Sequence, residues 1–460
     1  MASVLEKRSA KGLLVFRYNL RIHDNTALRT IRQCVEALDC VFIMDSAWSE
    51  SGEAGLPFRH GYRAKMGAHR RHFIQQALLD LQGQLERRGS SLVLLQGRFL
   101  ETLATVVRDG GYGHVALVDH PGHYEGQQIR QLQKLFPDTR WICTGEFTLF
   151  ERGALPFAEA ELPASFSRFR KQVESLVPVL PVDVIGALPP ATDYGLRLQR
   201  DDQSLWQTMA AESSACDDVR DSSTAHMIGG ESAALEHLNR YIHLTSAIRH
   251  YKETRNQLQG WDFSSKLSPW LAQGCLSPRM VWHEVLRHEQ RYGRNDSTGW
   301  LLFELLWREY FQWMARCYGA RMFRLRGIQD VNPLLTFYPE AFMAWREGNT
   351  PSAFVNAFMR QLKSTGWMSN RGRQIVASYL VNELGVDWRY GAAWFEEMLV
   401  DYDCAANWGN WQYLAGVGAD PRGRRRFNIE KQQAQYDPEG EFVTAWAGND
   451  DAQYLASFLR

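Results

Sequence analysis

The chain has 460 residues, which is more than one hydrophobic core comfortably supports, so its length predicts two domains. Its 52 basic and 52 acidic residues give zero net charge, so net charge neither indicates nor excludes nucleic-acid binding, which would need a local basic patch. The sequence contains no apolar run of about 18 residues and no secretory segment, which argues against a membrane span and favours the cytoplasm.

The first 150 residues alternate short apolar runs with amphipathic stretches. The predicted strands are 13–18, 40–44, 92–95, 114–118 and 140–143, and the predicted helices lie near 25–38, 64–88, 99–109 and 123–136. This alternation predicts a parallel five-stranded sheet covered by helices on both faces. No GxGxxG motif follows the first strand, so the usual dinucleotide-binding fingerprint is missing.

After residue 150 the composition and the spacing of apolar residues change twice. Residues 151–230 are rich in proline and polar side chains and predict an interdomain connector with short helices. From residue 231 to residue 460 the apolar residues fall at helical spacing, which predicts an all-helical domain after the α/β domain of residues 1–150. The seven cysteines contain no CxxC pair, so neither a metal site nor a disulfide framework is predicted.

Three hydroxyl side chains precede a proline that can start a helix. Ser264, Ser265 and Ser268 lie beside Pro269. One interpretation is simple capping of the helix. The other is a phosphate cradle, in which hydroxyls and free backbone N–H groups bind a diphosphate at the helix N-terminus.

Two further regions mix polar and aromatic side chains. Glu304 and Arg308 are spaced i and i+4, which suits a surface ion pair worth about 0.3–0.5 kcal/mol, yet apolar residues flank both. The segments 367–380 and 401–413 place charged and amide groups among large aromatic residues. Such groups are costly to bury unless they are paired or hold a ligand, so a binding site is indicated.

Together these segments resemble the cryptochrome/photolyase family. Residues 262–279 are similar to its TSxLSPxLAxGxLSPR signature, and residues 304–311 to its E-L-x-W-R-E helix. Gln374 and Tyr413 stand where duplex photolyases have Met and Trp, which is typical of the DASH branch, the single-stranded DNA photolyases. The resemblance covers essentially the whole chain.

The resemblance implies FAD as cofactor. The residues that match its binding set are Tyr251, Ser264, Ser265, Leu267, Ser268, Glu304, Arg308, Asn370, Arg373, Asp401, Asp403 and Asn407. Arg373 and Asp401 match a salt bridge beside the flavin ring, and Asn407 matches the position that faces flavin N5. Plant-type photoreceptors have Asp at the last position, so Asn407 favours repair over signalling.

The implied substrate is DNA that contains pyrimidine dimers. The residues that match the lesion site are Glu304, Trp307, Arg371, Gln374 and Tyr413. By match, the glutamate faces the lesion, the tryptophan stacks on the damaged bases and Arg371 contacts a phosphate, which positions the DNA without reading its sequence. The smaller and more polar clamp predicts a preference for single-stranded or looped DNA, because flipping a dimer out of a duplex costs a few kcal/mol.

Electron transfer to the flavin uses three tryptophans in this family. Trp411 matches the member nearest the flavin and Trp388 matches the middle one. At the surface position this chain has Tyr338, which is either a substitute electron donor or a core aromatic residue. With Glu304 and Asn407, these three residues form the implied catalytic set.

The family also implies a 5,10-methenyltetrahydrofolate antenna, but the segment His120–Glu125 does not preserve the glutamate with which DASH members hold it. The expected activity is blue-light-driven repair of cyclobutane pyrimidine dimers, as in deoxyribodipyrimidine photo-lyases. The alternatives are a blue-light photoreceptor or nucleic-acid-binding regulator with little repair, and a plain helical core. A basic cluster at 422–426 leaves RNA open as a partner, and a monomer is expected.

Overall fold

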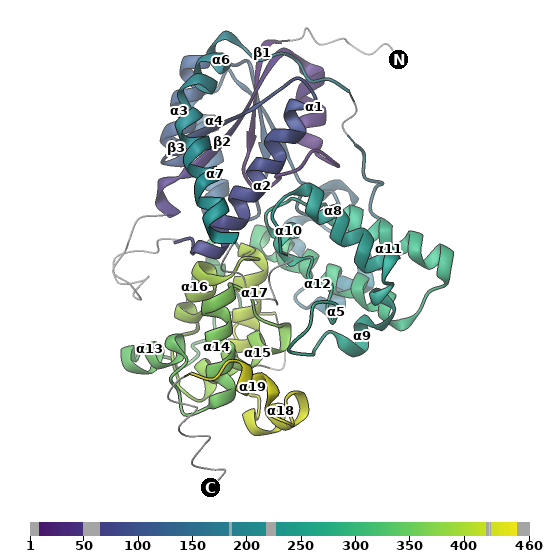
Figure 1. The fold of residues 1–460 in the computed structure, drawn as a ribbon, viewed down its shortest axis with the longest axis vertical. Coiled ribbons are helices and arrows are strands. Elements are labelled where there is room, and N and C mark those ends of the chain that lie inside the picture. Colours follow the sequence, from purple (N-terminus) through teal and green to yellow (C-terminus); the bar gives the residue numbers. More distant parts are fainter. Residues whose placement is uncertain are drawn as a thin grey trace.

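The computed structural model describes residues 9–48, 65–183, 186–217, 227–419, 423 and 425–448, with the backbone alone for residues 9 and 212–217. An α/β domain and a helical domain lie one above the other (Figure 1). Among the described helices, none combines the length and apolar composition that crossing a bilayer requires.

A five-stranded parallel sheet forms the α/β domain, in the order β3-β2-β1-β4-β5. The strands are β1 (Ser9–Phe16), β2 (Val35–Asp45), β3 (Leu92–Gly97), β4 (His114–Val118) and β5 (Arg140–Thr144). The predicted sheet is therefore confirmed. The prediction of helix for residues 35–38 is wrong, because Val35 to Leu38 pair with β1 and the helix ends at Cys34.

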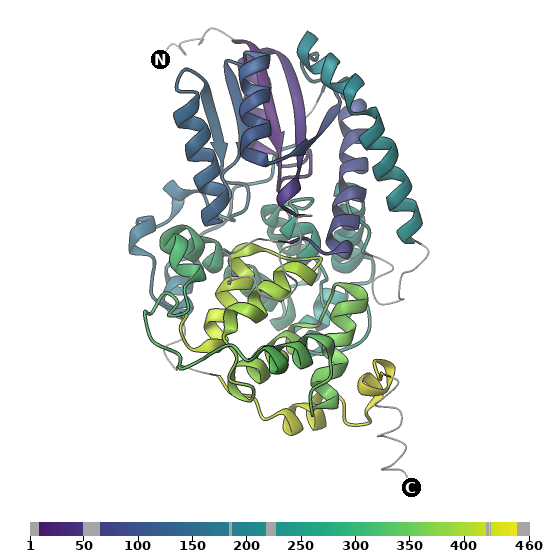
Figure 2. The same cartoon turned by 90° about the vertical axis from the view of Figure 1, so that its left-hand side faces the viewer.

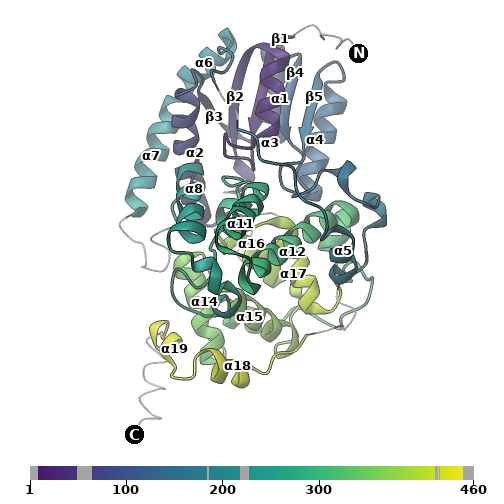
Figure 3. The ribbon, with the colours of Figure 1, turned by 90° about the vertical axis from the view of Figure 1, so that its right-hand side faces the viewer.

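Helices cover both faces of the sheet, as its alternating side chains require. Leu14 and Phe16 of β1 belong to the core with α1 (Thr26–Cys34) and α2 (Ala68–Glu86), whereas Leu13 and Val15 pack with α3 (Phe99–Gly110) and α4 (His123–Leu135). Figure 2 shows the molecule from the side of α3 and α4, in blue, and Figure 3 from the side of α1.

The connector region contains three helices, α5 (Phe166–Val173), α6 (Asp193–Asp201) and α7 (Gln203–Asp217). Helix α5 packs on the helical domain, while α6 packs beside β3 and α7 runs along α2 (Figure 3). Asp39 of β2 anchors the return of the chain, because it accepts hydrogen bonds from the backbone N–H and the hydroxyl of Thr192. The connector thus contributes helices to both domains.

The helical domain follows from residue 231, and the prediction of an all-helical second half is confirmed. Its helices are α8 (Glu231–Asn239), α9 (Tyr251–Thr254), α10 (Ser268–Ala272), α11 (Pro278–Tyr292), α12 (Asp296–Tyr318), α13 (Pro339–Glu347), α14 (Ala353–Thr365), α15 (Asn370–Asn382), α16 (Trp388–Met398), α17 (Cys404–Ala415), α18 (Ile429–Tyr436) and α19 (Glu441–Ala445). Single helical turns of other types lie at Ser46–Trp48, Arg152–Ala154, Glu159–Glu161, Arg240–Leu244, Ala247–His250 and Gly319–Phe323.

Buried carboxylates join the two domains. Glu231 accepts hydrogen bonds from the backbone N–H groups of Ile22 and His23, and Glu309 of α12 accepts from those of Leu149 and Phe150. Each carboxylate is desolvated but satisfied by several donors, which is the condition for burying such a group. These contacts hold the helical domain in a defined position under the sheet.

Candidate active site

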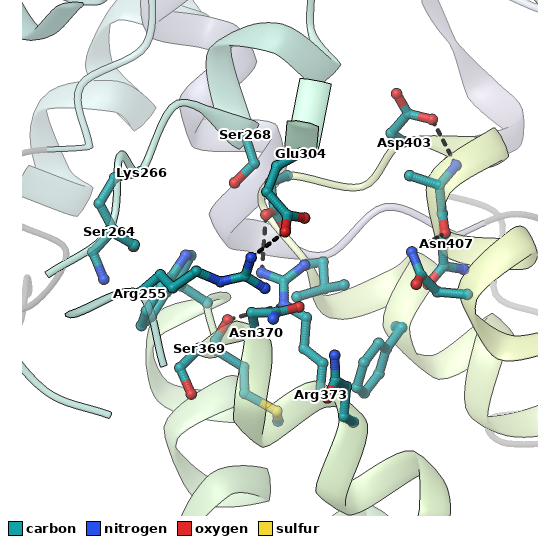
Figure 4. Close-up of a pocket in the computed structure, with 18 of the residues that line it drawn as sticks. Arg255, Ser264, Lys266, Ser268, Glu304, Ser369, Asn370, Arg373, Asp403 and Asn407 are labelled. Carbon is teal, nitrogen blue, oxygen red and sulfur yellow. Dashed lines mark hydrogen bonds and ion pairs between the residues drawn. The ribbon is translucent and has the colours of Figure 1, made fainter. Parts of the chain in front are cut away.

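A cavity of about 280 Å³ lies within the helical domain (Figure 4). Its walls come from the segments 251–257, 264–268, 367–377 and 395–414, together with Glu304 of α12. These segments are far apart in the sequence, so the helical packing alone creates the cavity.

Most of the residues expected to hold a cofactor line this cavity. They are Tyr251, Ser264, Ser265, Leu267, Ser268, Glu304, Asn370, Arg373, Asp401, Asp403 and Asn407. Arg308 does not line it. Its guanidinium lies behind the wall, 3.3 Å from the Asp403 carboxylate, and donates to the backbone carbonyl of Phe147.

The serine cluster lies at the N-terminus of α10. Ser268 is the first residue of that helix and Pro269 the second, and no side chain caps it. The capping interpretation is therefore not supported for Ser264, Ser265 and Ser268. Hydroxyls beside uncapped backbone N–H groups suit a diphosphate, and Figure 4 shows Ser264 and Ser268 on one side of the cavity, opposite Asp403 and Asn407.

Arg373 and Asp401 form an ion pair at the cavity wall, with 2.9 Å between Nη2 and Oδ2. Arg373 also donates through Nε to the carbonyl of Met368, which fixes its side chain. The other carboxylate oxygen of Asp401, Oδ1, is buried and lacks a hydrogen-bond partner among the described residues. An unpaired buried oxygen at a cavity wall indicates a ligand that donates a hydrogen bond there.

Asp403 directly precedes α17, and Asn407 lies in its first turn. Asp403 caps this helix by accepting from the backbone N–H of Ala406, and it also accepts a 2.7 Å hydrogen bond from Gln312 Nε2. The Asn407 amide nitrogen donates to the carbonyl of Ala392 at 3.0 Å. This bond fixes the orientation of a neutral amide that can exchange hydrogen bonds with a ligand without adding charge.

Two of the residues expected to contact a lesion, Glu304 and Gln374, line the cavity. The Glu304 carboxylate accepts hydrogen bonds from Arg255 and from Trp300 Nε1, the second at 3.1 Å. Figure 4 shows Arg255 and Glu304 pointing toward each other. The carboxylate is thus held in place.

The other three expected lesion residues lie outside the cavity lining. Trp307 stacks on Phe166 of α5, with ring centroids 3.7 Å apart, and makes an edge contact with Tyr413. Arg371 donates to the Gln374 amide oxygen at 3.0 Å and lies 4.9 Å from the ring centre of Tyr436. Arg371 is therefore packed under the end of α18, a contact that local sequence patterns do not predict.

Arg255 and Lys266 are among the cavity residues that were not predicted, and Trp367, the first residue of the predicted segment 367–380, also lines the cavity. Lys266 is buried, has a positive φ of 51° and places Nζ 3.4 Å from the centre of the Trp367 ring. Burial, reinforced by nearby Arg373, lowers the pKa of Lys266 to about 7. A signal existed in the sequence, because Lys266 stands between the serines already singled out and Arg255 follows Tyr251 by one helical turn.

The expected electron-transfer residues differ in position. Trp411 lines the cavity, and Trp388 is fully buried, with its indole N–H bonded to the carbonyl of Leu325. Tyr338 precedes α13 and is 52% exposed. The structure therefore places the first two inside the domain and the third at its surface.

A second cavity, of about 350 Å³, lies where the two domains meet. Glu125 lines it with a half-buried carboxylate, at the end of the segment His120–Glu125. Burial opposes ionisation of Glu125, but His120 and Arg17 outweigh this effect and lower its pKa. Tyr18 donates a hydrogen bond to the same carboxylate at 3.4 Å.

The family comparisons agree with this geometry. The model described as the FAD binding domain of DNA photolyase matches residues 300–450, and the model described as DNA photolyase matches residues 13–186. Cryptochrome DASH of Idiomarina loihiensis is 44% identical, covering 97% of this chain and 94% of that protein. Cryptochrome DASH of Vibrio parahaemolyticus is 42% identical, covering 95% and 94%.

Solved structures show the same architecture. A Synechocystis cryptochrome has a TM-score of 0.82 and 34% identity, covering 96% of this chain and 89% of that one. A class III photolyase from Agrobacterium tumefaciens has a TM-score of 0.75 and 25% identity, covering 97% and 88%. A helix N-terminus without a side-chain cap and with serine hydroxyls beside it, an ion pair with one unpaired carboxylate oxygen and an oriented amide fit the diphosphate and ring of FAD. The chain therefore belongs to the cryptochrome/photolyase family, in its DASH branch, and its helical domain binds FAD.

Proposed function

We propose that this chain is a light-driven carbon–carbon lyase that repairs cyclobutane pyrimidine dimers, mainly in single-stranded or looped DNA. The observation that carries the proposal is that one cavity is lined both by Glu304 and Gln374, matched to the lesion, and by Asn407 and Arg373, matched to the flavin. FAD, when bound, supplies the light absorption and the electron that splits the dimer.

The chain contributes position and charge. Ser264, Ser265 and Ser268 would hold the diphosphate, and the Arg373–Asp401 pair would fix the flavin ring beside Asn407. Arg255 keeps the Glu304 carboxylate directed along one wall of the cavity. A lesion that enters beside Glu304 is thereby held next to the cofactor, which is the orientation that an electron-transfer reaction needs.

The preference for single-stranded DNA rests on the clamp residues. Gln374 is tied to Arg371, and the guanidinium carbon of Arg425 lies 4.7 Å from the ring centre of Tyr413. Neither Gln374 nor Tyr413 offers the large apolar surface of Met or Trp that would offset the unstacking of a duplex. Of the basic cluster, Arg422 and Arg424 lie outside the described residues, and Arg426 pairs with Glu383.

The test is repair of a defined dimer under blue light by the purified flavin-loaded protein. Single-stranded, looped and duplex oligonucleotides carrying one dimer are compared, and we expect restoration of the single strand and the loop to exceed that of the duplex. Glu304→Gln should slow repair, whereas Glu284→Gln, a carboxylate on α11 that pairs with His243, should not. Equal repair of duplex and single strand would refute the substrate preference.

A flavin absorption band without repair of any oligonucleotide would favour the second candidate function, a blue-light photoreceptor or nucleic-acid-binding regulator. The naming of the relatives as cryptochromes is the observation that keeps this candidate. RNA oligonucleotides in the same binding assay test the regulator directly.

We further propose the second cavity as the place of a folate antenna. The Glu125 carboxylate can accept hydrogen bonds from a pterin ring, and Arg17, Arg70 and Arg98, which line the same cavity, can pair with the carboxylates of a glutamyl tail. Chromatography of the chromophores released from the purified protein tests this proposal. Glu125→Gln should lower folate content and leave FAD content unchanged.

A further inference from the structure

Aromatic rings in contact form a row from Trp388 to the protein surface. Trp388 and Trp408 are both fully buried, with ring centroids 5.7 Å apart. Trp408 lies 4.8 Å from Phe323, and Phe323 lies 5.4 Å from Tyr124, which is 46% exposed. Because electron transfer slows steeply with distance, rings in contact form a short path out of the core.

Trp408 has a proton acceptor that Trp388 lacks. Its indole N–H lies 3.0 Å from Glu396 Oε2 and 3.3 Å from the hydroxyl of Tyr402. Burial raises the pKa of Glu396 to about 7, which makes its carboxylate a stronger base than an exposed one. Trp388, by contrast, donates its N–H to the carbonyl of Leu325, a group that cannot take up the proton.

Glu396 also has a route to solvent. Glu396 and Tyr402 line the second cavity, next to Tyr124 and Phe323. A proton accepted by Glu396 therefore lies at the wall of an open space between the domains. Tyr338 lies elsewhere, before α13, and makes no ring contact with Trp388 among the described residues.

We propose that Trp408 is the residue at which the positive charge comes to rest after light-driven electron transfer, and that Glu396 accepts its proton. The inference rests on the light-driven flavin chemistry proposed above, with the excited flavin as one-electron oxidant, but not on any DNA lesion. Trp408 gives one electron to the radical cation of Trp388, which returns to its neutral form. The resulting radical cation of Trp408 then loses its N–H proton to the Glu396 carboxylate.

The cycle closes with a soluble thiolate as reductant. The thiolate gives one electron to the neutral Trp408 radical and becomes a thiyl radical, while Glu396 returns the proton to the indole nitrogen. Because the proton moves away from the indole, the charge cannot return to Trp388 until that proton comes back. The transfer of the proton to Glu396 thus prolongs the life of the Trp408 radical, so that the thiolate can reduce it.

The test is flash photolysis of the flavin-loaded protein without DNA, with and without a thiol. The absorption of the tryptophan radical distinguishes its cationic from its neutral form. Trp408→Phe should remove the neutral radical and speed charge recombination several-fold. Trp313→Phe is the matched control, because Trp313 is also buried and donates its N–H to a buried carboxylate, Glu309, at 2.7 Å.

Two variants of Glu396 and a mass-spectrometric measurement of indole oxidation distinguish a redox role of Trp408 and Glu396 from a structural one. Glu396→Gln should slow deprotonation of the radical, and Glu396→Asp should restore it in part. Illumination in air without thiol, followed by peptide mass spectrometry, should find an oxidised indole at Trp408 in the parent protein and a loss of that product in Trp408→Phe.

The neutral radical persisting in Trp408→Phe, or disappearing in Tyr338→Phe while Trp408 is intact, would overturn the inference. If Trp408→Phe loses its flavin, the Glu396 variants decide the question. If dimers are not repaired but the radical signal is intact, only the proposed lyase function is rejected. If dimers are repaired normally but Trp408 contributes nothing to the radical signal, only this inference is rejected.

Discussion

The ion pair between Arg373 and Asp401 gives the most quantitative prediction. The Asp401 side chain is 2% exposed and the Arg373 side chain is 26% exposed, so the carboxylate is buried while the guanidinium is partly hydrated. Removing one partner of a fully buried pair costs about 3–5 kcal/mol. Since water reaches Arg373 and screens the charges, we expect Arg373→Met to lower the free energy of unfolding of the flavin-free protein by about 2–3 kcal/mol.

A double-mutant cycle with Asp401→Asn isolates the interaction, and we expect a coupling energy of about 1–2 kcal/mol. Urea unfolding is followed by tryptophan fluorescence and by far-UV circular dichroism, and coincident transitions are required because two domains can unfold separately. The control is the i,i+4 pair of Arg326 and Asp330, which are 58% and 70% exposed. A coupling energy for Arg373 and Asp401 no larger than that of this surface pair would refute the reasoning.

Three further outcomes are expected. Gly391→Ala would place a methyl group 2.2 Å from Trp411, so we expect the free energy of unfolding to fall by about 1–3 kcal/mol. We also expect tryptophan radicals to appear more slowly after a light flash. An unchanged rate of radical formation would contradict this prediction. Burial raises the pKa of Glu309 from 4.5 to about 7, so its contribution to stability is present below pH 4.5 and is lost as the pH rises through 7. In Glu309→Gln, the decrease in the free energy of unfolding between pH 5 and 8 should be smaller by about 2–3 kcal/mol. An identical pH profile of stability in the variant would argue against this reasoning. Phe166→Leu removes the ring stacked on Trp307, a contact worth about 0.5–1.5 kcal/mol. The variant should bind a dimer-containing oligonucleotide roughly 2- to 10-fold more weakly, as measured by fluorescence anisotropy. Unchanged affinity would show that the stack does not position the indole.

Local patterning predicted most of the fold. The parallel sheet follows from apolar runs separated by helical stretches, because buried parallel strands and their covering helices differ in period and in length. The end of α1 was misplaced, since Val35 to Leu38 suit either element and pairing with β1 decides between them. The position of α7 along α2 was not predicted, because nothing in its own residues names the surface on which it packs.

For the site, the sequence by itself determined which side chains are present and, through motif resemblance, predicted which of them would hold a flavin. Only the tertiary structure decided how each one is held. Arg308 lies behind the wall of the cavity rather than in it, Arg371 is packed under Tyr436, and Trp408 meets Glu396 from a different helix. Motifs record residues that are near one another in the chain, whereas hydrogen-bond partners, burial and ring contacts depend on segments that only folding brings together. That is the physical reason why most of the residues that line the cavity could be predicted from the sequence, while the aromatic row through Trp408 could not.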